Sequence, residues 1–491
     1  MSLKRSVLAL ILAGALAACT PVRNPATGEL QYTSVSPQEE VAIGKAEHPK
    51  ILAEYGGAYG DAKVTRYVSG IGQKLAKVSD TPDLTFTFTV IDSDIVNAFA
   101  LPGGYVYVTR GLLALANNEA ELAGVLAHEI GHVAARHTAQ RITQAQMGQI
   151  GAGLATVLGA VLLGDTGAQL GQQLGGTGAQ LYIQRYSREQ EFQADELGVR
   201  YLARAGYDPQ AMATFLGQLE QNDRLQAKIS GRESASVVAG WFASHPRTRD
   251  RVERAAAEAA AANPADRRTD RKAYLAAIDG LVYGESPEQG FVRGRAFLHP
   301  GLKLAFEAPP GFVLKNTPDR VIGQDRGGRL LLFDVGKVRP GTDLAAYLQQ
   351  GWLKAQRLQG LQRLDGGGTE AAVGFGRVKF QDATLPAMFA VARGPGDLVA
   401  RFVFLDRRGL DERDVAVFDG TVRSVRTLSA SEIAGLKPMR IQVVPVKAGD
   451  TAASLGDRMQ VPDLPRETFA VINDLDDYPL RPGEPVKLVR K

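Results

Sequence analysis

The chain has 491 residues, enough for two to four domains, and its composition of 45% hydrophobic and 22% charged residues is that of a globular protein. The net charge is only +4 and no long basic run follows the N-terminus, so the sequence gives no reason to expect a nucleic-acid partner. The single cysteine, Cys19, excludes a disulfide within the mature chain.

The N-terminal residues have the layout of a secretory signal. Lys4 and Arg5 precede an apolar run over residues 7–18, which is too short to span a bilayer. The run ends at Cys19 and resembles the bacterial lipobox, in which the cysteine is lipidated after removal of residues before it. Because threonine follows the cysteine, the resemblance implies a lipoprotein on the periplasmic side of the outer membrane. The alternative is a plain secretory signal and a soluble periplasmic protein. Residues 20–36 are rich in Pro, Asn and Thr and are expected to form a tether.

Two strands are predicted ahead of the central motif. Residues 84–91 alternate as LTFTFTVI, which is typical of a strand. Residues 105–109 form a second predicted strand, directly after the turn signal of Pro102, Gly103 and Gly104.

Residues 117–137 predict a helix that carries His128, Glu129 and His132. Residues four apart lie one turn above each other on a helix, so both imidazoles reach a single metal ion and Glu129 faces the open coordination position. Zinc held by two imidazoles and a carboxylate keeps a water ligand whose pKa falls toward neutrality, and Glu129 is the expected general base for that water. The alternative is a chance HExxH match, expected about 0.004 times in such a chain.

The segment around the motif adds three expectations. His137 lies about 180° around the helix from His128, so it is expected at the surface or as a cap rather than on the metal. Residues 150–163 are apolar or glycine and too short to cross a membrane, and a glycine-rich hairpin or lid is favoured over a buried helix. In zinc peptidases an extended substrate commonly adds to a sheet edge. We therefore assign the substrate edge to the stretch ahead of the helix, with a core hairpin as the alternative. Its residues are Asn97, Gly103, Gly104 and Tyr105.

A second amphipathic helix is predicted over residues 186–204. Glu191 and Asp195 lie one turn apart on one face, the arrangement needed for a carboxylate ligand and an acceptor that fixes the tautomer of a ligating histidine. Further along, His245 precedes Pro246, and a lone His-Pro pair is by itself most often a cap or a turn.

The sequence pattern changes in the C-terminal half of the chain. Residues 261–290 read as a linker, and residues 291–429 as an α+β domain of open function with short strands and helical patterns at 343–358 and 411–425. Residues 443–489 parse as strand, helix, helix, strand, and no repeat period is visible.

Three motifs in order carry a family resemblance: HEIGH at residues 128–132, EFQAD at 191–195 and Ser-His-Pro at 244–246. Together with residues 97–111 they resemble the HtpX-like and CAAX-prenyl-protease-like zinc metalloendopeptidases, in the periplasmic BepA-like branch. The resemblance covers residues 37–260 and implies a mainly helical zincin-type (gluzincin) domain with a small sheet. It implies one zinc ion on His128, His132 and Glu191, with Glu129 as base. It also implies that Asp195 and Arg251 support the site, and that His245 either stabilises the oxyanion or blocks the metal at rest.

The chain departs from the BepA-like pattern because it lacks a tetratricopeptide array. Residues 440–491 instead look like a LysM-type module, which implies contact with peptidoglycan and leaves glycan binding open. The expected function is a zinc metalloendopeptidase that cleaves misfolded or stalled envelope proteins. The competing hypothesis is an envelope chaperone or scaffold whose zinc is structural and capped. A cell-wall amidase is disfavoured, because the Glu191 helix belongs to a peptidase layout.

Overall fold

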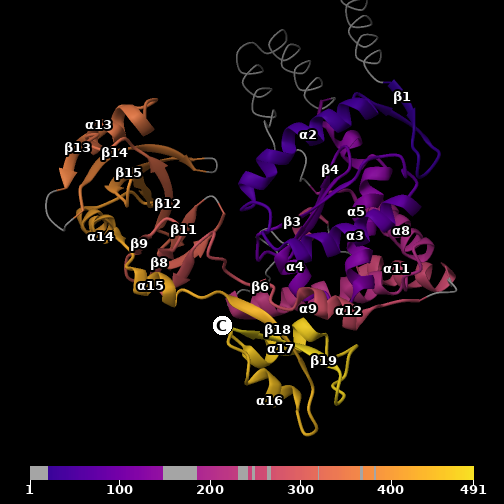
Figure 1. Ribbon diagram of the computed structural model, residues 1–491. Helices are drawn as coiled ribbons and strands as arrows, with labels where there is room; N and C mark the ends of the chain where they lie inside the picture. Colours follow the sequence, from indigo (N-terminus) through magenta and orange to yellow (C-terminus); the bar gives the residue numbers. More distant parts are fainter. Residues whose placement is uncertain are drawn as a thin grey trace, which may run out of the picture. The chain divides into compact units, whose positions relative to one another are not determined.

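The computed structural model describes residues 20–146, 185–230, 241–245, 249–262, 267–318, 320–364, 369–380 and 383–491. The predicted signal with Cys19, the apolar run 150–163 and Pro246 lie outside the described residues. Among the helices described, none combines the length and the hydropathy needed to span a bilayer. The chain divides into two units (Figure 1): unit 1 contains residues 1–52, 57–283 and 440–490, and unit 2 contains residues 53–56, 284–439 and 491.

Unit 1 is mainly helical with small sheets, in agreement with the predicted α+β class. Its helices are α2 (Pro37–Glu54), α3 (Ala62–Val78), α4 (Arg110–Leu115), α5 (Glu119–Ala134), α8 (Arg188–Arg204), α9 (Ala211–Ser230), α10 (Trp241–Ser244), α11 (Arg249–Ala262) and α12 (Arg271–Ile278). Its N-terminal strands are β1 (Thr20–Arg23), β2 (Leu30–Thr33), β3 (Thr87–Ile91), β4 (Ala98–Leu101), β5 (Tyr105–Thr109) and β6 (Val282–Tyr283).

Helix α5 is the buried centre of unit 1 and crosses α8 at close range. The side chain of Asn118 caps it by accepting a hydrogen bond from the backbone N–H of Glu121. Glycines allow the close crossing: a Cβ on Gly131 would lie 3.1 Å from the carbonyl oxygen of Ala194, and one on Gly198 would lie 3.2 Å from the backbone nitrogen of His128. The crossing places the histidines of α5 directly against the carboxylates of α8.

The sheet beside α5 has the strand order β3, β5, β4, with β3 parallel and β4 antiparallel to β5. The expectation that Tyr105 belongs to the free edge is wrong, because β5 is the middle strand and β4 forms the edge. Gly103 and Gly104 turn the chain between β4 and β5 with φ angles of 77° and 89°. Gly103 also lets α2 approach, since a Cβ there would lie 2.6 Å from the Cα of Val41.

The prediction of a tether over residues 20–36 is wrong: β1 and β2 pair as an antiparallel hairpin. The side-chain oxygen of Asn24 accepts hydrogen bonds from the backbone N–H groups of Ala26 and Thr27, which builds the turn. Its side-chain amide donates to the carbonyl of Ala135 at 2.8 Å and so fixes the hairpin to the end of α5. A composition of Pro, Asn and Thr fits a tight turn as well as a tether, which is why the pattern misled.

Unit 2 is built on an antiparallel sheet with the order β10-β11-β12-β16-β15-β14-β13, beside a smaller sheet with the order β17-β9-β8-β7. The strands are β7 (Phe291–Arg293), β8 (Ala296–His299), β9 (Leu304–Glu307), β10 (Val313–Asn316), β11 (Val321–Gln324), β12 (Leu330–Lys337), β13 (Gln359–Leu364), β14 (Ala371–Phe380), β15 (Ala383–Arg393), β16 (Leu398–Leu405) and β17 (Arg426–Thr427). Helix α14 (Glu412–Arg423) confirms the second helical pattern, whereas the first yields only α13 (Leu344–Ala346) and a π-helical segment (Tyr347–Trp352). The helix α15 (Ala430–Gly435) follows β17.

The C-terminal segment follows the predicted order of strand, helix, helix, strand: β18 (Met439–Pro445), α16 (Ala452–Gly456), α17 (Pro465–Asn473) and β19 (Pro485–Arg490). It is part of unit 1, and β18 lies between β19 and β6 in one sheet. Two backbone hydrogen bonds of 2.8 Å tie Ile441 to Gly280 and Leu281. Its likeness to a LysM module stays a prediction.

A buried lysine fastens the C-terminal segment to the rest of unit 1. The ammonium of Lys487 donates hydrogen bonds to the carbonyls of Ala114, Leu115 and Ala116 at 3.0, 3.1 and 2.8 Å. These carbonyls end α4, where a helix leaves acceptors without intrahelical donors. The chain reaches α5 immediately after them, so Lys487 supports the segment that leads into the histidine helix.

Replacing Lys487 with methionine should destabilise unit 1, because the carbonyls of Ala114 and Ala116 lose the ammonium as a donor, whereas the carbonyl of Leu115 keeps the side-chain amide of Gln218. We expect the free energy of unfolding to fall by about 1–3 kcal/mol, the usual cost of leaving buried polar groups unsatisfied. Thermal unfolding followed by circular dichroism measures the change. Lys447→Met, at an exposed position of the same segment, is the matched control. Equal melting temperatures for the two variants would contradict a capping role for Lys487.

Candidate active site

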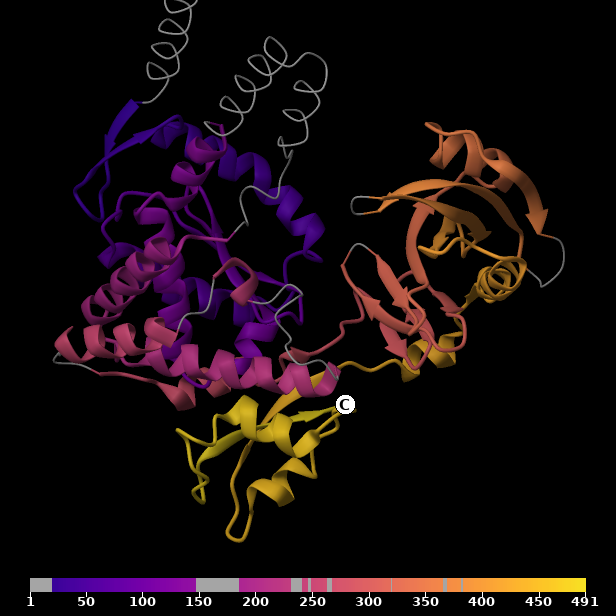
Figure 2. The same ribbon diagram turned by 180° about the vertical axis from the view of Figure 1, so that it is seen from behind.

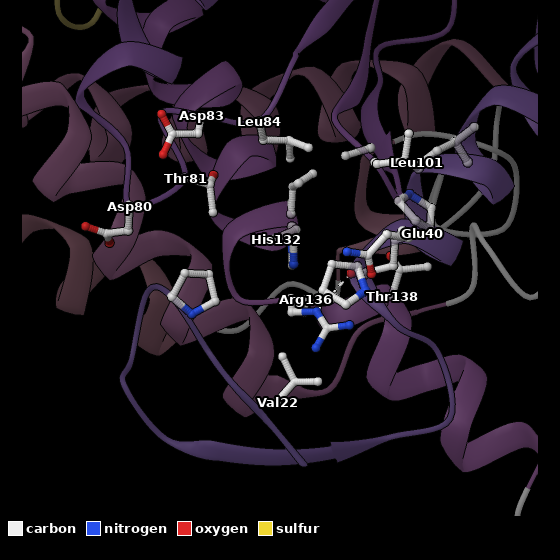
Figure 3. Close-up of a pocket in the computed structure, with 18 of the residues that line it drawn as sticks. Val22, Glu40, Asp80, Thr81, Asp83, Leu84, Leu101, His132, Arg136 and Thr138 are labelled. Carbon is white, nitrogen blue, oxygen red and sulfur yellow. Dashed lines mark hydrogen bonds and ion pairs between the residues drawn. The ribbon is translucent and has the colours of Figure 1, made fainter. Parts of the chain in front are cut away.

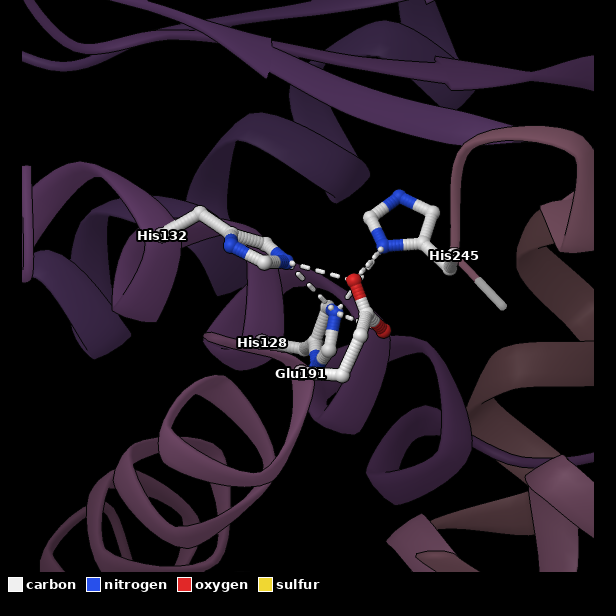
Figure 4. Close-up of side chains that lie close together, drawn as sticks. All are labelled: His128, His132, Glu191 and His245. Atoms are coloured by element: carbon white, nitrogen blue, oxygen red, sulfur yellow. Dashed lines mark hydrogen bonds and ion pairs between the residues drawn. The ribbon is translucent and has the colours of Figure 1, made fainter. Parts of the chain in front are cut away.

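Four side chains from three segments converge in unit 1 (Figure 4). His128 and His132 come from α5, Glu191 comes from α8, and His245 follows α10; all four are buried. The two Nε2 atoms of His128 and His132 lie 3.0 Å apart. Nδ1 of His245 lies 3.3 Å from Nε2 of His128 and 3.0 Å from Oε1 of Glu191, which in turn lies 3.5 Å from Nε2 of His132.

These spacings match the donor set of a tetrahedral metal ion. Metal bonds of about 2.0–2.1 Å put neighbouring ligand atoms about 3.3–3.4 Å apart. The observed separations of 3.0, 3.3 and 3.5 Å, and of 3.8 Å between Nε2 of His128 and Oε2 of Glu191, scatter around that value. Nitrogen and oxygen donors of this kind suit zinc. The residues present therefore fit a zinc ion.

Asp195 and Arg251 orient the cluster from behind. Oδ1 of Asp195 lies 2.9 Å from Nδ1 of His128, which holds the ring with Nε2 toward the other ligand atoms. The guanidinium of Arg251 donates to both oxygens of Asp195, at 2.7 and 2.8 Å, and also contacts Oε2 of Glu191 at 2.5 Å. Burial opposes ionisation of Glu191, but His245 and Arg251 outweigh it and lower the pKa of Glu191 well below its usual value. Glu191 is therefore an ionised ligand candidate.

Glu129 lies beside the cluster without a hydrogen-bond partner among the described residues. Burial raises the pKa of Glu129 above its usual value, and Oε1 of Glu129 lies 3.4 Å from Nε2 of His245. The ring of Trp241 stacks on His245 with centroids 4.2 Å apart, and its backbone N–H donates to the carbonyl of Val96. The segment that carries His245 is therefore attached to the chain just ahead of β4.

His137 is buried and adjoins the cluster, so the expectation of a surface or capping histidine is wrong. Helix α5 ends at Ala134, and Arg136 has a φ of 57°, in the left-handed region. Because the helical geometry ends at this turn, the rotation of 100° per residue that would place His137 opposite His128 does not apply to His137. Its Nδ1 lies 2.8 Å from Nδ1 of His132, and its Nε2 lies 2.7 Å from Oε1 of Gln193.

The contacts of His137 determine proton positions when a metal occupies Nε2 of His132. The proton of His132 must then sit on Nδ1 and be donated to Nδ1 of His137. His137 consequently carries its own proton on Nε2 and donates it to Gln193. Burial lowers the pKa of His137 to about 4, which keeps the ring neutral as this arrangement requires.

Sequence reasoning missed four residues at this site: His137, Gln193, Tyr186 and Trp241. Tyr186 stacks on the ring of His132 with centroids 3.7 Å apart, and the guanidinium of Arg141 lies 3.8 Å from the centre of the tyrosine ring. Gln193 lies inside the EFQAD motif, two residues after Glu191, so its proximity could have been inferred. The aromatic pair gives no periodic signal, since Tyr186 precedes the N-cap Ser187 of α8 and Trp241 is the first residue of the four-residue helix α10.

A cavity of about 650 Å³ lies beside His132 (Figure 3). Its walls are the end of β4 with the following turn, the residues after the HExxH motif, the start of α2, the loop before β3, and the β1–β2 hairpin. Lining residues include Ala100, Leu101, Gly103, His132, Val133, Arg136, Glu40, Val41, Leu84 and Val22. An ion pair of 2.9 Å joins Arg136 to Glu40 in this wall.

The predicted substrate-edge residues are distributed around this cavity. Gly103 lines it, whereas Asn97, Gly104 and Tyr105 are not among its lining residues. Asn97 precedes β4 and is buried, and its side-chain oxygen has no hydrogen-bond partner within the described part of the chain. The structure thus brings His128, Glu129 and His132 together with Glu191, Asp195, His245 and Arg251, while the edge stretch lies next to them.

The order of motifs and the geometry of the cluster agree with a comparison against protein families. Residues 62–259 match the model described as Peptidase family M48. This segment of the chain is similar to peptidase family M48. M48 metalloproteases use zinc, and the four-residue cluster of the M48 segment can bind a metal ion. The predicted resemblance to these zinc metallopeptidases and the predicted cofactor are therefore confirmed for residues 62–259, whereas the LysM-like part of the recognition stays a prediction.

Curated relatives resemble the same part of the chain. The beta-barrel assembly-enhancing protease of Yersinia pestis is 35% identical over 211 residues, which cover 42% of each chain. A putative beta-barrel assembly-enhancing protease of Vibrio cholerae is 30% identical over 258 residues, or 50% of each chain. The mitochondrial metalloendopeptidase OMA1 of Schizosaccharomyces pombe is 29% identical over 230 residues, covering 46% of this chain and 63% of the relative. The chain thus spans about half the length of the bacterial relatives it matches.

Replacement of His137 by leucine should weaken zinc binding by about 10- to 100-fold, as loss of a partner behind a metal ligand typically does. His132 would lose the acceptor that keeps its proton away from Nε2. Glutamine at position 137 offers an amide oxygen in place of that acceptor, so His137→Gln should retain most of the affinity.

The affinity is measured by competition with a chromophoric chelator, which reports on the metal rather than on turnover. His299→Leu, in unit 2, serves as the control for loss of a histidine. Equal weakening by leucine and glutamine at position 137 would show that the hydrogen bond from His132 is unimportant.

Proposed function

We propose that the chain is a zinc-dependent endopeptidase of the bacterial cell envelope that hydrolyses peptide bonds in misfolded or stalled envelope proteins. The observation that supports this most directly is the set of four ligand atoms spaced for one metal, with the unpaired carboxylate of Glu129 beside them. A catalytic zinc site keeps one of its four positions for water, which in this chain requires that His245 leave the metal and that Glu129 face the vacated position. The names of the bacterial relatives, proteases that enhance β-barrel assembly, support an envelope substrate.

Each side chain has a distinct role in this proposal. His128, His132 and Glu191 hold the zinc ion, Asp195 and His137 fix the two imidazole tautomers, and Arg251 keeps Glu191 and Asp195 ionised. Bound zinc would acidify a water molecule and polarise the scissile carbonyl. Glu129 accepts the proton and delivers it to the leaving amine, a task that its burial and raised pKa favour.

The edge strand β4 is the proposed site of substrate pairing. In an antiparallel pair, alternate residues turn their backbone N–H and C=O groups away from the partner strand. Since Phe99 and Tyr107 are register partners and Asn97 accepts from Thr109, Ala98 and Ala100 turn these groups away from β5. Ala100 also lines the cavity beside His132. An extended polypeptide could therefore pair with β4 regardless of its sequence.

His245 supports a second candidate function. Its Nδ1 lies close enough to His128 and Glu191 to be a fourth metal ligand, and Trp241 stacks on its ring. A permanently capped metal would be structural, and the chain would then act as a chaperone or scaffold. We favour the protease, in which His245 caps the metal at rest and moves aside for substrate.

The proposed location is the periplasmic side of the outer membrane, with a lipid anchor at Cys19. The lipobox resemblance supports the anchor, and a soluble periplasmic protein is the alternative. Peptidoglycan contact by residues 440–491 rests on the LysM resemblance alone. Within that segment the buried side chain of Asn473 accepts a hydrogen bond from the backbone N–H of Lys487 at 2.7 Å and donates one to its carbonyl at 2.9 Å. Asn473 therefore has a structural role.

The substitution Glu129→Gln tests the assigned base. It should leave the fold and the zinc content unchanged and lower the rate of casein hydrolysis by at least about 100-fold, because general base catalysis typically contributes 10²–10⁴. Zinc content is read by atomic absorption and turnover by release of soluble peptides. Glu189→Gln, at an exposed position of α8, is the control. A zinc-loaded Glu129→Gln protein with full activity would refute the assignment.

The substitution His245→Ala separates the protease from the scaffold. If His245 caps the metal at rest, its removal should raise casein turnover several-fold while zinc remains bound. A fall of tenfold or more would instead assign His245 to transition-state stabilisation. A zinc-loaded variant with no turnover, like the parent protein, would favour the scaffold.

A further inference from the structure

The β1–β2 hairpin has two chemically different faces. Pro21 pairs with Tyr32, and Arg23 pairs with Leu30, so these four residues share one face of the hairpin. All four are exposed, with 52% of Leu30 and 67% of Tyr32 accessible to solvent. On the opposite face Val22, Gln31 and Thr33 are at least partly buried, and Val22 lines the cavity beside His132 together with Arg23. One short hairpin thus joins an exposed, largely apolar surface to the wall of the candidate substrate cavity.

Exposed apolar side chains concentrate on this side of unit 1. Among the large hydrophobic residues that are exposed in its described residues, Leu30, Tyr32 and Val41 lie close together in sequence, and Ile229 on α9 is the remaining one. Val41 lines the same cavity as Val22 and Arg23. Figures 1 and 2 both show β1 and α9 at opposite ends of the part of unit 1 that precedes residue 284. The clustering marks one surface, and such surfaces commonly meet a partner.

We propose that the face formed by Pro21, Arg23, Leu30 and Tyr32 docks on the lipid surface of the membrane that holds the chain, and that docking places the cavity beside His132 at this surface. The inference rests on the proposed lipid anchor at Cys19. It deepens the proposed function by naming a substrate class: polypeptide segments that lie on, or emerge from, the membrane surface.

Chain length forces this contact once Cys19 is acylated. Pro21 follows Cys19 by two residues, which span at most about 7 Å. Tyr32 lies about 5 Å further, across the antiparallel pair. The headgroup layer of one leaflet is itself about 5–7 Å thick, the difference between the whole bilayer and its hydrocarbon core. The start of the hairpin therefore lies within or directly above the headgroups, because no tether separates it from the acylated residue.

The side chains of this face suit that position. Tyrosine has an apolar ring and a polar hydroxyl and is enriched at membrane interfaces. Leu30 supplies an aliphatic side chain, and the guanidinium of Arg23 matches the phosphates of anionic headgroups. A second protein molecule would also suit an apolar face, but it would have to fit between the hairpin and the bilayer. We therefore assign the face to lipid.

The hairpin is attached firmly enough to orient the active site. Asn24 and Gln31 both donate to the carbonyl of Ala135, at 2.8 and 3.3 Å, directly after the histidine helix. The guanidinium of Arg136 donates to the carbonyl of Val35 at 2.8 Å. The position of the hairpin therefore determines how α5 and the cavity face the membrane.

Fluorescence at single positions tests the docking. Acylation consumes the only native thiol, so Leu30→Cys or Tyr32→Cys introduces a unique site for an environment-sensitive dye. The full lipidated chain is inserted into vesicles of phosphatidylethanolamine and phosphatidylglycerol, after mass spectrometry has verified the acyl groups. Dyes at 30 and 32 should shift to shorter wavelength and be quenched by spin-labelled headgroups. Ile229→Cys, also exposed in unit 1, is the control that should show neither effect.

Each other outcome overturns the proposal. Water-like emission at positions 30 and 32, equal to that at 229, would show that the face stays in solvent. Shielding that appears only when unfolded casein is added would assign the face to polypeptide instead. Failure to find acyl groups would remove the proposed anchor, whereas casein hydrolysis reports on the peptidase independently of both.

The functional arm uses a double substitution, Leu30→Ser with Tyr32→Ser. Hydrolysis of free casein should be unchanged, because neither side chain lines the cavity. Hydrolysis of casein tethered to the same vesicles should fall at least threefold. An unchanged ratio of tethered to free hydrolysis would contradict the assigned substrate class.

Discussion

The close crossing of α5 and α8 is the constraint on which the rest of the site depends. Gly131 and Gly198 let the two helices approach until the imidazoles of one meet the carboxylates of the other. Such an approach concentrates negative charge in a buried region, and the guanidinium of Arg251 compensates it by contacting Glu191 and Asp195 together. Removal of that cation would leave two buried carboxylates competing for protons, which is costly in a region of low dielectric. The site is thus a balanced group of charges rather than a motif alone.

The sequence predicted those features of the site that depend on the spacing of apolar residues within one helix. The helix with His128 and His132 and the helix with Glu191 and Asp195 follow from apolar spacing, and their side chains meet as expected. The placement of His137 failed because a single left-handed residue, Arg136, ends the regular geometry that the estimate assumed. The prediction of a tether failed because Asn24 builds a tight turn, so that this stretch rich in Pro, Asn and Thr forms a hairpin. Both errors come from individual backbone conformations, which composition and periodicity do not contain.

Contacts between distant parts of the sequence were equally beyond prediction. Strand β5 follows a strong turn signal, but only the pairing of β3 on its other side makes it a middle strand. The position of Lys487 near the C-terminus gives no hint that its ammonium ends α4, more than 370 residues earlier. Unit 2 could be recognised as α+β, whereas neither its two sheets nor their strand order follows from the pattern of short apolar runs.

The pairing of β6 with β18 has a consequence for how the molecule is assembled. The chain leaves unit 1 after Tyr283 and returns at Arg440, and the hydrogen bonds between residues 280–281 and 441 hold the two crossing points side by side. A segment whose ends are already adjacent can be lengthened, shortened or exchanged at a small entropic cost to its host. Changes in the length of the segment between residues 284 and 439 should therefore leave the histidine helix and its C-terminal support intact.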